Sequence, residues 1–243
     1  MIFIIVIIVA IAIYFVIKIS NYVIKISNYN KTSYKKITHN SYFSTMYDKG
    51  RRGEYEIYRY LKHYEKIGYK FLFNVYLPSA NGKTTELDVL MISPKIVFVF
   101  ESKNYSGWIF GNDNQKMWTQ VLPTGRGKGK SQKEHFYNPV WQNKSHCTAL
   151  KEQLPADVVI KSVVLFSNRC TLKDITVNSP EVLVANRRDA NVLVKESLQT
   201  NIESNLDVEQ IYNNLYPYSQ VSEEVKQSHI EEINIYKTHN NRQ

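Results

Sequence analysis

The chain is poor in the residues that build disulfide frameworks and zinc sites. Its 243 residues include two cysteines, Cys147 and Cys170, which form no CxxC pair and have no zinc-ligand spacing. Its six histidines include no HExxH motif. These absences argue against a disulfide-stapled protein and against a zinc enzyme, and they suit a reducing compartment.

Acidic residues are missing from the start of the chain, where none precedes Asp48. Instead, Ile2–Ile17 form an unbroken apolar run that Ile19 extends past Lys18. A bilayer core needs roughly 20 apolar residues, so we expect a transmembrane anchor over residues 1–20. The alternatives are a cleaved signal peptide, which would carry positive charge before the run, and a buried core strand.

Residues 21–48 are basic and polar. The motif VIKISNY occurs twice in succession, at Val16–Tyr22 and Val23–Tyr29, which favours a duplication that lengthens a linker; the alternative is a basic interfacial collar. We therefore interpret 21–48 as a juxtamembrane linker. Five lysines follow the apolar run: Lys18, Lys25, Lys31, Lys35 and Lys36. By the positive-inside rule they predict a single-pass protein of the cell membrane with a cytoplasmic domain.

Composition allows one folded domain with appendages. The hydrophobic content of 43% can support a core, and we expect the domain at 49–217 with a polar tail at 218–243. The formal charge of +9 and the pI near 9.3 indicate a polyanionic partner or an anionic lipid surface. Charge alone does not choose between them.

A predicted hairpin carries the most informative motif of the chain. The apolar segments VLMIS and IVFVF flank Pro94 and Lys95 and predict two adjacent antiparallel strands. If Ser93 and Ile96 close the turn, the numbers of paired residues sum to 189. That register places an acid on each strand at the same point of the ladder.

The two acids of this register are Asp88 and Glu101, and strand periodicity sends Lys103 to the same face. Two carboxylates directly opposite each other repel, and a hard divalent cation between them would neutralise the repulsion. The alternative is a solvated acidic face on which Lys103 is an exposed salt-bridging lysine.

Two predicted helices bring further polar groups. In the first, Glu54 shares the apolar stripe of Ile57 and Leu61 at helical spacing, and the alternative is a first-turn acid near a helix N-terminus. In the second, which begins at the cap Asn138 and Pro139, two polar residues lie four apart and can reach one point. They are Gln142 and His146, for which plain surface polarity is the alternative. Apolar runs after Pro155 predict further strands, and a last helix is expected at Val208–Leu215.

A glycine-rich basic segment, Gly125–Lys133, superficially resembles a phosphate loop. Thr124 stands where the first glycine should be, and no apolar strand leads into the segment, so we reject nucleotide binding. The remaining interpretations are a contact with a nucleic-acid backbone and a plain solvated loop. The basic residues concerned are Arg126, Lys128, Lys130 and Lys133.

Five segments occur in a recognisable order: GRRGE, TELDVLMIS, VFVFESKN, SGWIFG and NPVWQ. Together they resemble the nuclease-related domain, NERD, a bacterial branch of the PD-(D/E)XK nuclease-like superfamily, over about Lys49–Gln153. The resemblance implies an α/β fold with a restriction-endonuclease-like core, in which a central mixed sheet is flanked by helices. One departure is Ile96, where such domains often carry glycine, which puts the assumed turn register in doubt.

The resemblance also implies roles for individual residues. It makes Asp88 and Glu101 the metal-binding acids, Lys103 the catalytic lysine, Glu54 the acid of the leading helix and Gln142 the family's glutamine. The implied cofactor is Mg²⁺ or Mn²⁺, and the implied activity is hydrolysis of phosphodiester bonds, in DNA more than in RNA. The alternatives are a non-catalytic nucleic-acid- or protein-binding module on this fold and a membrane-tethered scaffold.

Overall fold

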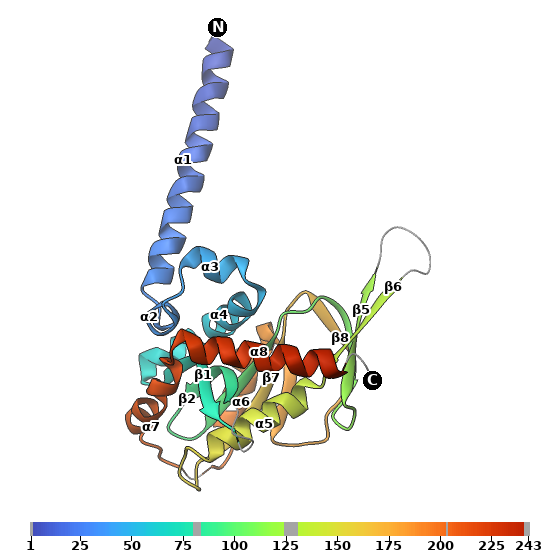
Figure 1. Cartoon of the computed structure of the whole chain (residues 1–243). Helices are drawn as coiled ribbons and strands as arrows, with labels where there is room; N and C mark the ends of the chain where they lie inside the picture. The colour runs from blue at the N-terminus through green and yellow to red at the C-terminus, as the bar shows by residue number, and fades with distance from the viewer. Residues whose placement is uncertain (1, 80–83, 124–130, 203, 241–243) are drawn as a thin grey trace.

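The computed structural model describes residues 2–79, 84–123, 131–202 and 204–240, and it has the expected α/β class (Figure 1). Helices span α1 (Ile2–Asn30), α2 (Ser33–Thr38), α3 (Tyr42–Tyr47), α4 (Lys49–Leu61), α5 (Pro139–Lys151), α6 (Ala190–Leu198), α7 (Val208–Leu215) and α8 (Glu223–Asn240). Short 3₁₀ helices are η1 (Lys62–Ile67), η2 (Arg187–Asp189) and η3 (Tyr216–Ser219). The helix predicted at Val208–Leu215, α7, has the expected bounds but is not the last, since α8 follows it.

The strands of the described residues form two mixed sheets flanked by helices, where one sheet was predicted. They span β1 (Lys70–Pro78), β2 (Thr84–Ile92), β3 (Val97–Lys103), β4 (Gly107–Asn112), β5 (Met117–Pro123), β6 (Ser131–Tyr137), β7 (Ile160–Phe166), β8 (Cys170–Thr176) and β9 (Val182–Asn186). The larger sheet has the order β1-β2-β3-β7-β9, with the first three strands antiparallel and β7 and β9 parallel to β3. The smaller sheet has the order β6-β5-β4-β8.

The chain passes from the larger sheet to the smaller one at a bend after β3. Gly107, at the start of β4, has φ 77°, and a Cβ there would lie 2.3 Å from the carbonyl oxygen of Val121. Only glycine tolerates both the backbone conformation and the close approach. The parallel pair β3 and β7 thus continues, beyond the bend, as the parallel pair β4 and β8.

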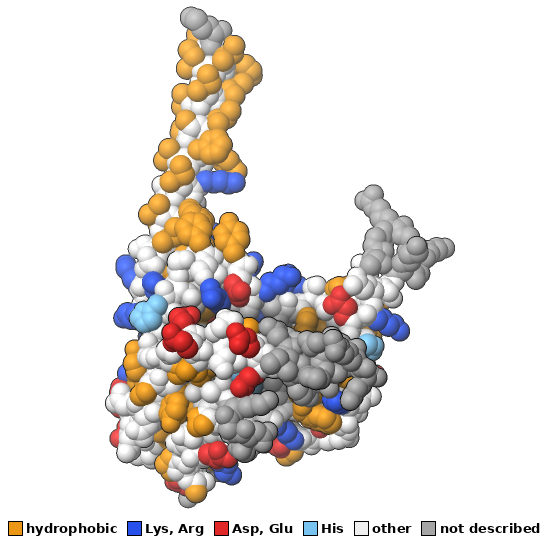
Figure 2. All heavy atoms as spheres, in the orientation of Figure 1, with side chains coloured by type: hydrophobic (Ala, Val, Ile, Leu, Met, Phe, Trp, Pro, Cys, Tyr) orange, Lys and Arg blue, Asp and Glu red, His pale blue; other side chains and the backbone are white. Residues whose placement is uncertain are grey.

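The helix α1 projects from the body as a long rod, and apolar side chains cover its outer part (Figures 1 and 2). It is long and apolar enough to cross a membrane, with a mean hydropathy of 3.2 in its most apolar window. The helix does not stop at the expected end of the anchor, residue 20, but continues to Asn30.

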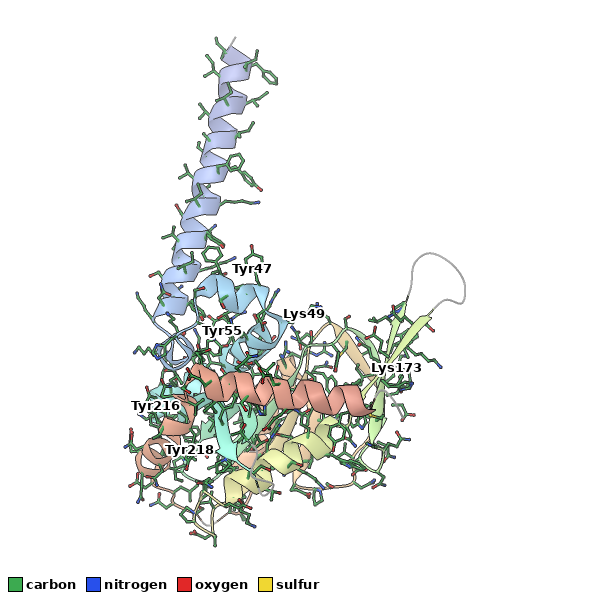
Figure 3. All side chains as sticks on the ribbon, in the orientation of Figure 1. Tyr47, Lys49, Tyr55, Lys173, Tyr216 and Tyr218 are labelled. Carbon is green, nitrogen blue, oxygen red and sulfur yellow. The ribbon has the colours of Figure 1, made fainter. Side chains whose placement is uncertain are left out.

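The segment 21–48, expected to be a basic juxtamembrane linker, is largely helical and packs on the domain. This segment forms the end of α1 and the helices α2 and α3, and Tyr29, Tyr34 and Ile37 are buried in the main core. The centroid of the Tyr29 ring lies 5.1 Å from that of Tyr55 on α4. Figure 3 labels Tyr55, below α3 in this view. Aromatic rings spaced among lysines and serines carry enough apolar area to dock short helices, although the segment is polar on average.

The predicted polar tail at 218–243 also needs correction, since most of it is the helix α8, which lies across β2. His229 of α8 is 8% exposed. Its ring meets that of Tyr76 edge to face at 5.6 Å, and its Nδ1 lies 3.2 Å from Thr84 Oγ1. A single histidine buried among the described side chains of α8 gave little sequence signal for this packing.

Truncation tests whether the first helices belong to the folded body. A variant that begins at Lys49 loses the burial of Tyr29, Tyr34 and Ile37. Burial of each side chain stabilises the fold by up to about 3 kcal/mol. We expect its free energy of unfolding, measured by urea denaturation, to be lower by at least about 3 kcal/mol than that of a variant that begins at Asn21. Equal stability of the two variants would mean that the segment is the linker the sequence suggested.

Candidate active site

The hairpin of β2 and β3 has the register that the sequence predicts. Val89 pairs with Phe100 and Ile92 with Val97, so paired numbers sum to 189, and the turn closes with a hydrogen bond from Ser93 N to Ile96 O of 3.1 Å. Ile96 at the turn therefore does not disturb the register. Its side chain is buried in the main core, which explains why an apolar residue suits the position.

The β2–β3 ladder ends one pair before the acids. Beyond Val89 and Phe100 no further pair forms, and Asp88 Oδ2 accepts a hydrogen bond of 2.8 Å from Ser102 N. The carboxylate therefore takes the place of a backbone acceptor at the fork, the point beyond Val89 and Phe100 where β2 and β3 separate. Asp88 is held at this fork, rather than as a regular cross-strand partner of Glu101.

Glu101 and Lys103 form a buried ion pair beside this fork. Lys103 Nζ lies 2.7 Å from Glu101 Oε1 and donates a hydrogen bond of 2.8 Å to Gln142 Oε1 of α5. Glu101 is 2% exposed. The three predicted residues Glu101, Lys103 and Gln142 are thus brought together.

The second polar residue of α5 reaches the same carboxylate. His146 Nε2 lies 3.2 Å from Glu101 Oε2, without the alignment of a hydrogen bond, and its Nδ1 lies 2.6 Å from Thr85 Oγ1. Asn138, whose side-chain oxygen accepts a hydrogen bond from Val140 N, begins the helix that carries both groups. The expectation that Gln142 and His146 reach one point is confirmed.

Glu54 lies on the buried face of α4 with Ile57 and Leu61, as its spacing predicts. Its Oε2 accepts hydrogen bonds from Tyr34 Oη of α2 at 3.1 Å and from Asn74 Nδ2 of β1 at 3.2 Å. A residue of the supposed linker therefore holds a predicted site acid.

Glu86 is an acid of this cluster that the sequence reasoning did not select. Its Oε1 accepts hydrogen bonds from Asn74 Nδ2 at 3.1 Å and from Tyr76 Oη at 2.8 Å. Asn74 thus bridges Glu54 and Glu86, and it has φ 50°, a left-handed conformation that Asn tolerates better than most residues. The signals were a polar Asn inside an apolar strand and an acid two residues before Asp88.

Burial and mutual repulsion set the charge states of the acids. Burial, with repulsion by Glu101 and Glu54, raises the pKa of Asp88 well above its usual range. Burial opposes ionisation of Glu101 as well, yet Lys103 and His146 outweigh it and lower the pKa of Glu101 to about 2. The carboxylate of Glu101 is therefore charged at neutral pH. Asp88 is the acid of this pair whose ionisation is disfavoured.

Asp88 and Glu101 are the acids that could hold a divalent cation. Among the described residues, no group of three or more His, Cys, Asp or Glu side chains is arranged as a metal site. Glu101 Oε2 is buried and has no hydrogen-bond partner among the described residues. Two carboxylates, one of which has beside His146 an oxygen that accepts no hydrogen bond, suit a cation that keeps most of its water, rather than one enclosed by protein ligands.

The predicted basic loop is only partly described. Arg126, Lys128 and Lys130 lie outside the described residues, whereas Lys133 belongs to β6, exposed and paired with Val121. Residues 131–133, expected to belong to the loop, instead begin the strand β6, which pairs with β5.

The part of the chain that carries this site matches a known family of domains. Residues 49–167 match the family described as the nuclease-related domain, NERD. An uncharacterized protein of Bacillus anthracis is 29% identical over 182 residues, which cover 75% of this chain and 82% of that protein. No solved structure matches the chain. The matched residues include every described site acid.

The pH dependence of stability tests the burial of Glu54. Burial and repulsion by Glu86 raise the pKa of Glu54 from 4.5 to about 7, so the native state holds this proton more tightly than the unfolded state. In EDTA, the wild type should therefore lose stability relative to Glu54→Gln as pH rises from about 4.5 to 7, by up to about 3 kcal/mol.

The measurement is the urea unfolding free energy of chains beginning at Asn21, from pH 4.5 to 8. Glu56→Gln is the control, since Glu56 is a less buried acid of α4 paired with Arg59. A constant difference between wild type and Glu54→Gln across this range would show that Glu54 ionises normally.

Proposed function

We propose that this protein, which carries a nuclease-related domain over residues 49–167, is a metal-dependent nuclease that hydrolyses phosphodiester bonds of DNA or RNA. The observation that carries the proposal is the buried Glu101–Lys103 ion pair beside Asp88. A fully structural role would not require a lysine, two repelling carboxylates and a glutamine at one point of the sheet.

The side chains support distinct roles. Lys103, held by Glu101 and Gln142, presents a fixed positive charge that would offset phosphate charge and orient the attacking water. Glu54, whose pKa lies near neutrality, could accept a proton from that water. His146, on α5, lies beside Oε2 of Glu101 and would help to hold that carboxylate in place.

Mg²⁺ or Mn²⁺ is the proposed cofactor, held by Asp88 and Glu101. The fit rests on Glu101 Oε2, which lies beside His146 but accepts no hydrogen bond, and on the repulsion at Asp88, which a bound cation would reduce. When bound, such an ion would lower the pKa of water and stabilise charge on the scissile phosphate.

We further propose that α1 anchors the protein in the cell membrane with the domain in the cytoplasm. The support is the length and composition of the helix and the lysines that follow its apolar part. The exposed Lys133 is proposed to hold the nucleic-acid backbone, without reading its sequence, together with Arg126, Lys128 and Lys130, which lie outside the described residues.

Substitution of the central residues tests the chemistry. Asp88→Asn, Glu101→Gln and Lys103→Met should each slow metal-dependent cleavage of labelled DNA or RNA at least about 100-fold. Asp174→Asn, an exposed acid of β8, is the control and should cleave normally. Unchanged cleavage in all three variants would refute this active site, and no cleavage by the wild type with either metal would favour a non-catalytic binding module.

Fractionation of cells tests the anchor. The full chain should sediment with membranes and stay there in high salt and carbonate, whereas a chain that begins at Asn21 should be soluble, because it lacks the apolar run. Protease added outside intact cells should not digest the C-terminus. Digestion would place the domain on the opposite side of the membrane.

A further inference from the structure

Arg187, in η2 directly after β9, is buried without an acidic partner. Its Nη2 donates to Ser102 Oγ at 3.1 Å and its Nη1 to Asn104 Oδ1 at 3.3 Å, while its Nε has no partner among the described residues. The side chain is 4% exposed. Burial lowers the pKa of Arg187 to about 10, which still leaves the guanidinium charged at neutral pH.

A second arginine meets the same asparagine from the solvent side. Arg169, exposed in the turn between β7 and β8, donates from Nη2 to both Asn104 O and Asn104 Oδ1 at 3.1 Å. Its Nε donates to Ser167 Oγ at 3.2 Å. The two guanidinium groups therefore share Asn104 Oδ1, although their like charges repel each other.

Only neutral oxygens accept these hydrogen bonds. None of the ion pairs among the described residues involves Arg169 or Arg187. Glu56 and, less strongly, Asp88 raise the pKa of Arg187, but neither forms an ion pair with it among the described residues. Two adjacent positive charges, one of them buried, with no ion-paired acid are costly unless an anion joins them.

The location of the pair links it to the proposed active site. Asn104 directly follows Lys103, and Ser102, which contacts Arg187, donates its backbone N–H to Asp88. The helix α4 closes the other side, since Asn104 Nδ2 donates to Lys49 O at 2.7 Å; Figure 3 labels Lys49 at the start of α4.

The close approach of α4 depends on a glycine. A Cβ at Gly53 would lie 2.4 Å from Ser102 Oγ and 2.8 Å from Arg187 Nη2. The residue before Glu54 is thus small enough to let the helix lie against the buried arginine, so the arginines and the acids belong to one compact arrangement.

We propose that Arg169, Arg187 and Asn104 form a phosphate subsite, which binds a second phosphate of the nucleic acid whose scissile bond lies at Asp88, Glu101 and Lys103. Arg169 makes the contact through its exposed guanidinium, and Arg187 supplies a second charge beneath it and holds Asn104 in place. Guanidinium groups match phosphate oxygens in geometry and charge. The subsite rests on the proposed nuclease function, and its phosphate is either a terminal monoester or an internal diester.

Direct binding without turnover tests the subsite. Full-length protein in detergent micelles is titrated, in EDTA, against fluorescein-labelled single-stranded oligonucleotides, and anisotropy is followed at several KCl concentrations. Arg169→Ala should weaken binding roughly tenfold and reduce the salt slope by about one. Arg188→Ala is the matched control, because Arg188 is an exposed neighbour that only approaches Asp189 at 3.8 Å, and it should change affinity less than about twofold.

Three oligonucleotides distinguish the two sources of phosphate: one with a 5′-phosphate, one with a 3′-phosphate and one with hydroxyls at both ends. A loss confined to one phosphorylated end assigns the subsite to that terminal phosphate, and an equal loss on all three assigns it to an internal diester. Arg187→Lys, which keeps the positive charge but lacks the planar guanidinium group, should also weaken binding.

The outcomes separate the subsite from the catalytic proposal. Binding and salt slope of Arg169→Ala equal to wild type, in a variant with an unchanged melting temperature, would overturn the subsite even if the wild type cleaves. A wild type that binds through Arg169 yet never cleaves with Mg²⁺ or Mn²⁺ would overturn the nuclease and leave a phosphate-binding module.

Discussion

The constraint on which this structure depends is the crowding of carboxylates at one end of a buried sheet. Glu54, Glu86, Asp88 and Glu101 come from α4, β2 and β3, and each raises the cost of ionising another. Like charges in a low-dielectric interior persist only if cations or hydrogen-bond donors compensate them. Among the surrounding elements, α2, α5 and β1 bring such compensating groups.

The compensation is divided among several parts of the chain. α5 supplies His146 and the glutamine that steadies Lys103, while α2 and β1 supply the donors to Glu54. Asn74 reaches two acids at once and adopts a left-handed backbone conformation inside a strand to do so. Local strain at a site of this kind is maintained by the surrounding packing, here the aromatic rings beside Phe73.

The sequence predicted the centre of the site better than its surroundings. The register of β2 and β3 followed from two uninterrupted apolar runs and one short turn, and Glu54 followed from helical periodicity, because both patterns are local. The role of Tyr34 depends on a contact between separate helices, and its polar neighbourhood concealed it, whereas Tyr76 meets Glu86 as its partner on the adjacent strand. Segments 21–48 and 218–243 were misjudged for the same reason, since a few buried rings outweigh an average polarity.

The uninterrupted passage of α1 into the core has a mechanical consequence. The helix has 29 residues and would be about 44 Å long, and the ring of Tyr29 in its last turn is locked among those of Tyr34, Tyr42 and Tyr55. A domain on a flexible linker samples all orientations. A domain on a rigid helix chiefly rotates about the helix axis and tilts with the helix. If α1 crosses the bilayer, the face that carries Glu101 and Lys103 keeps a nearly constant height and inclination above the lipid. Encounters with the proposed nucleic-acid substrate would then be a search in two dimensions, favouring strands that lie along the membrane.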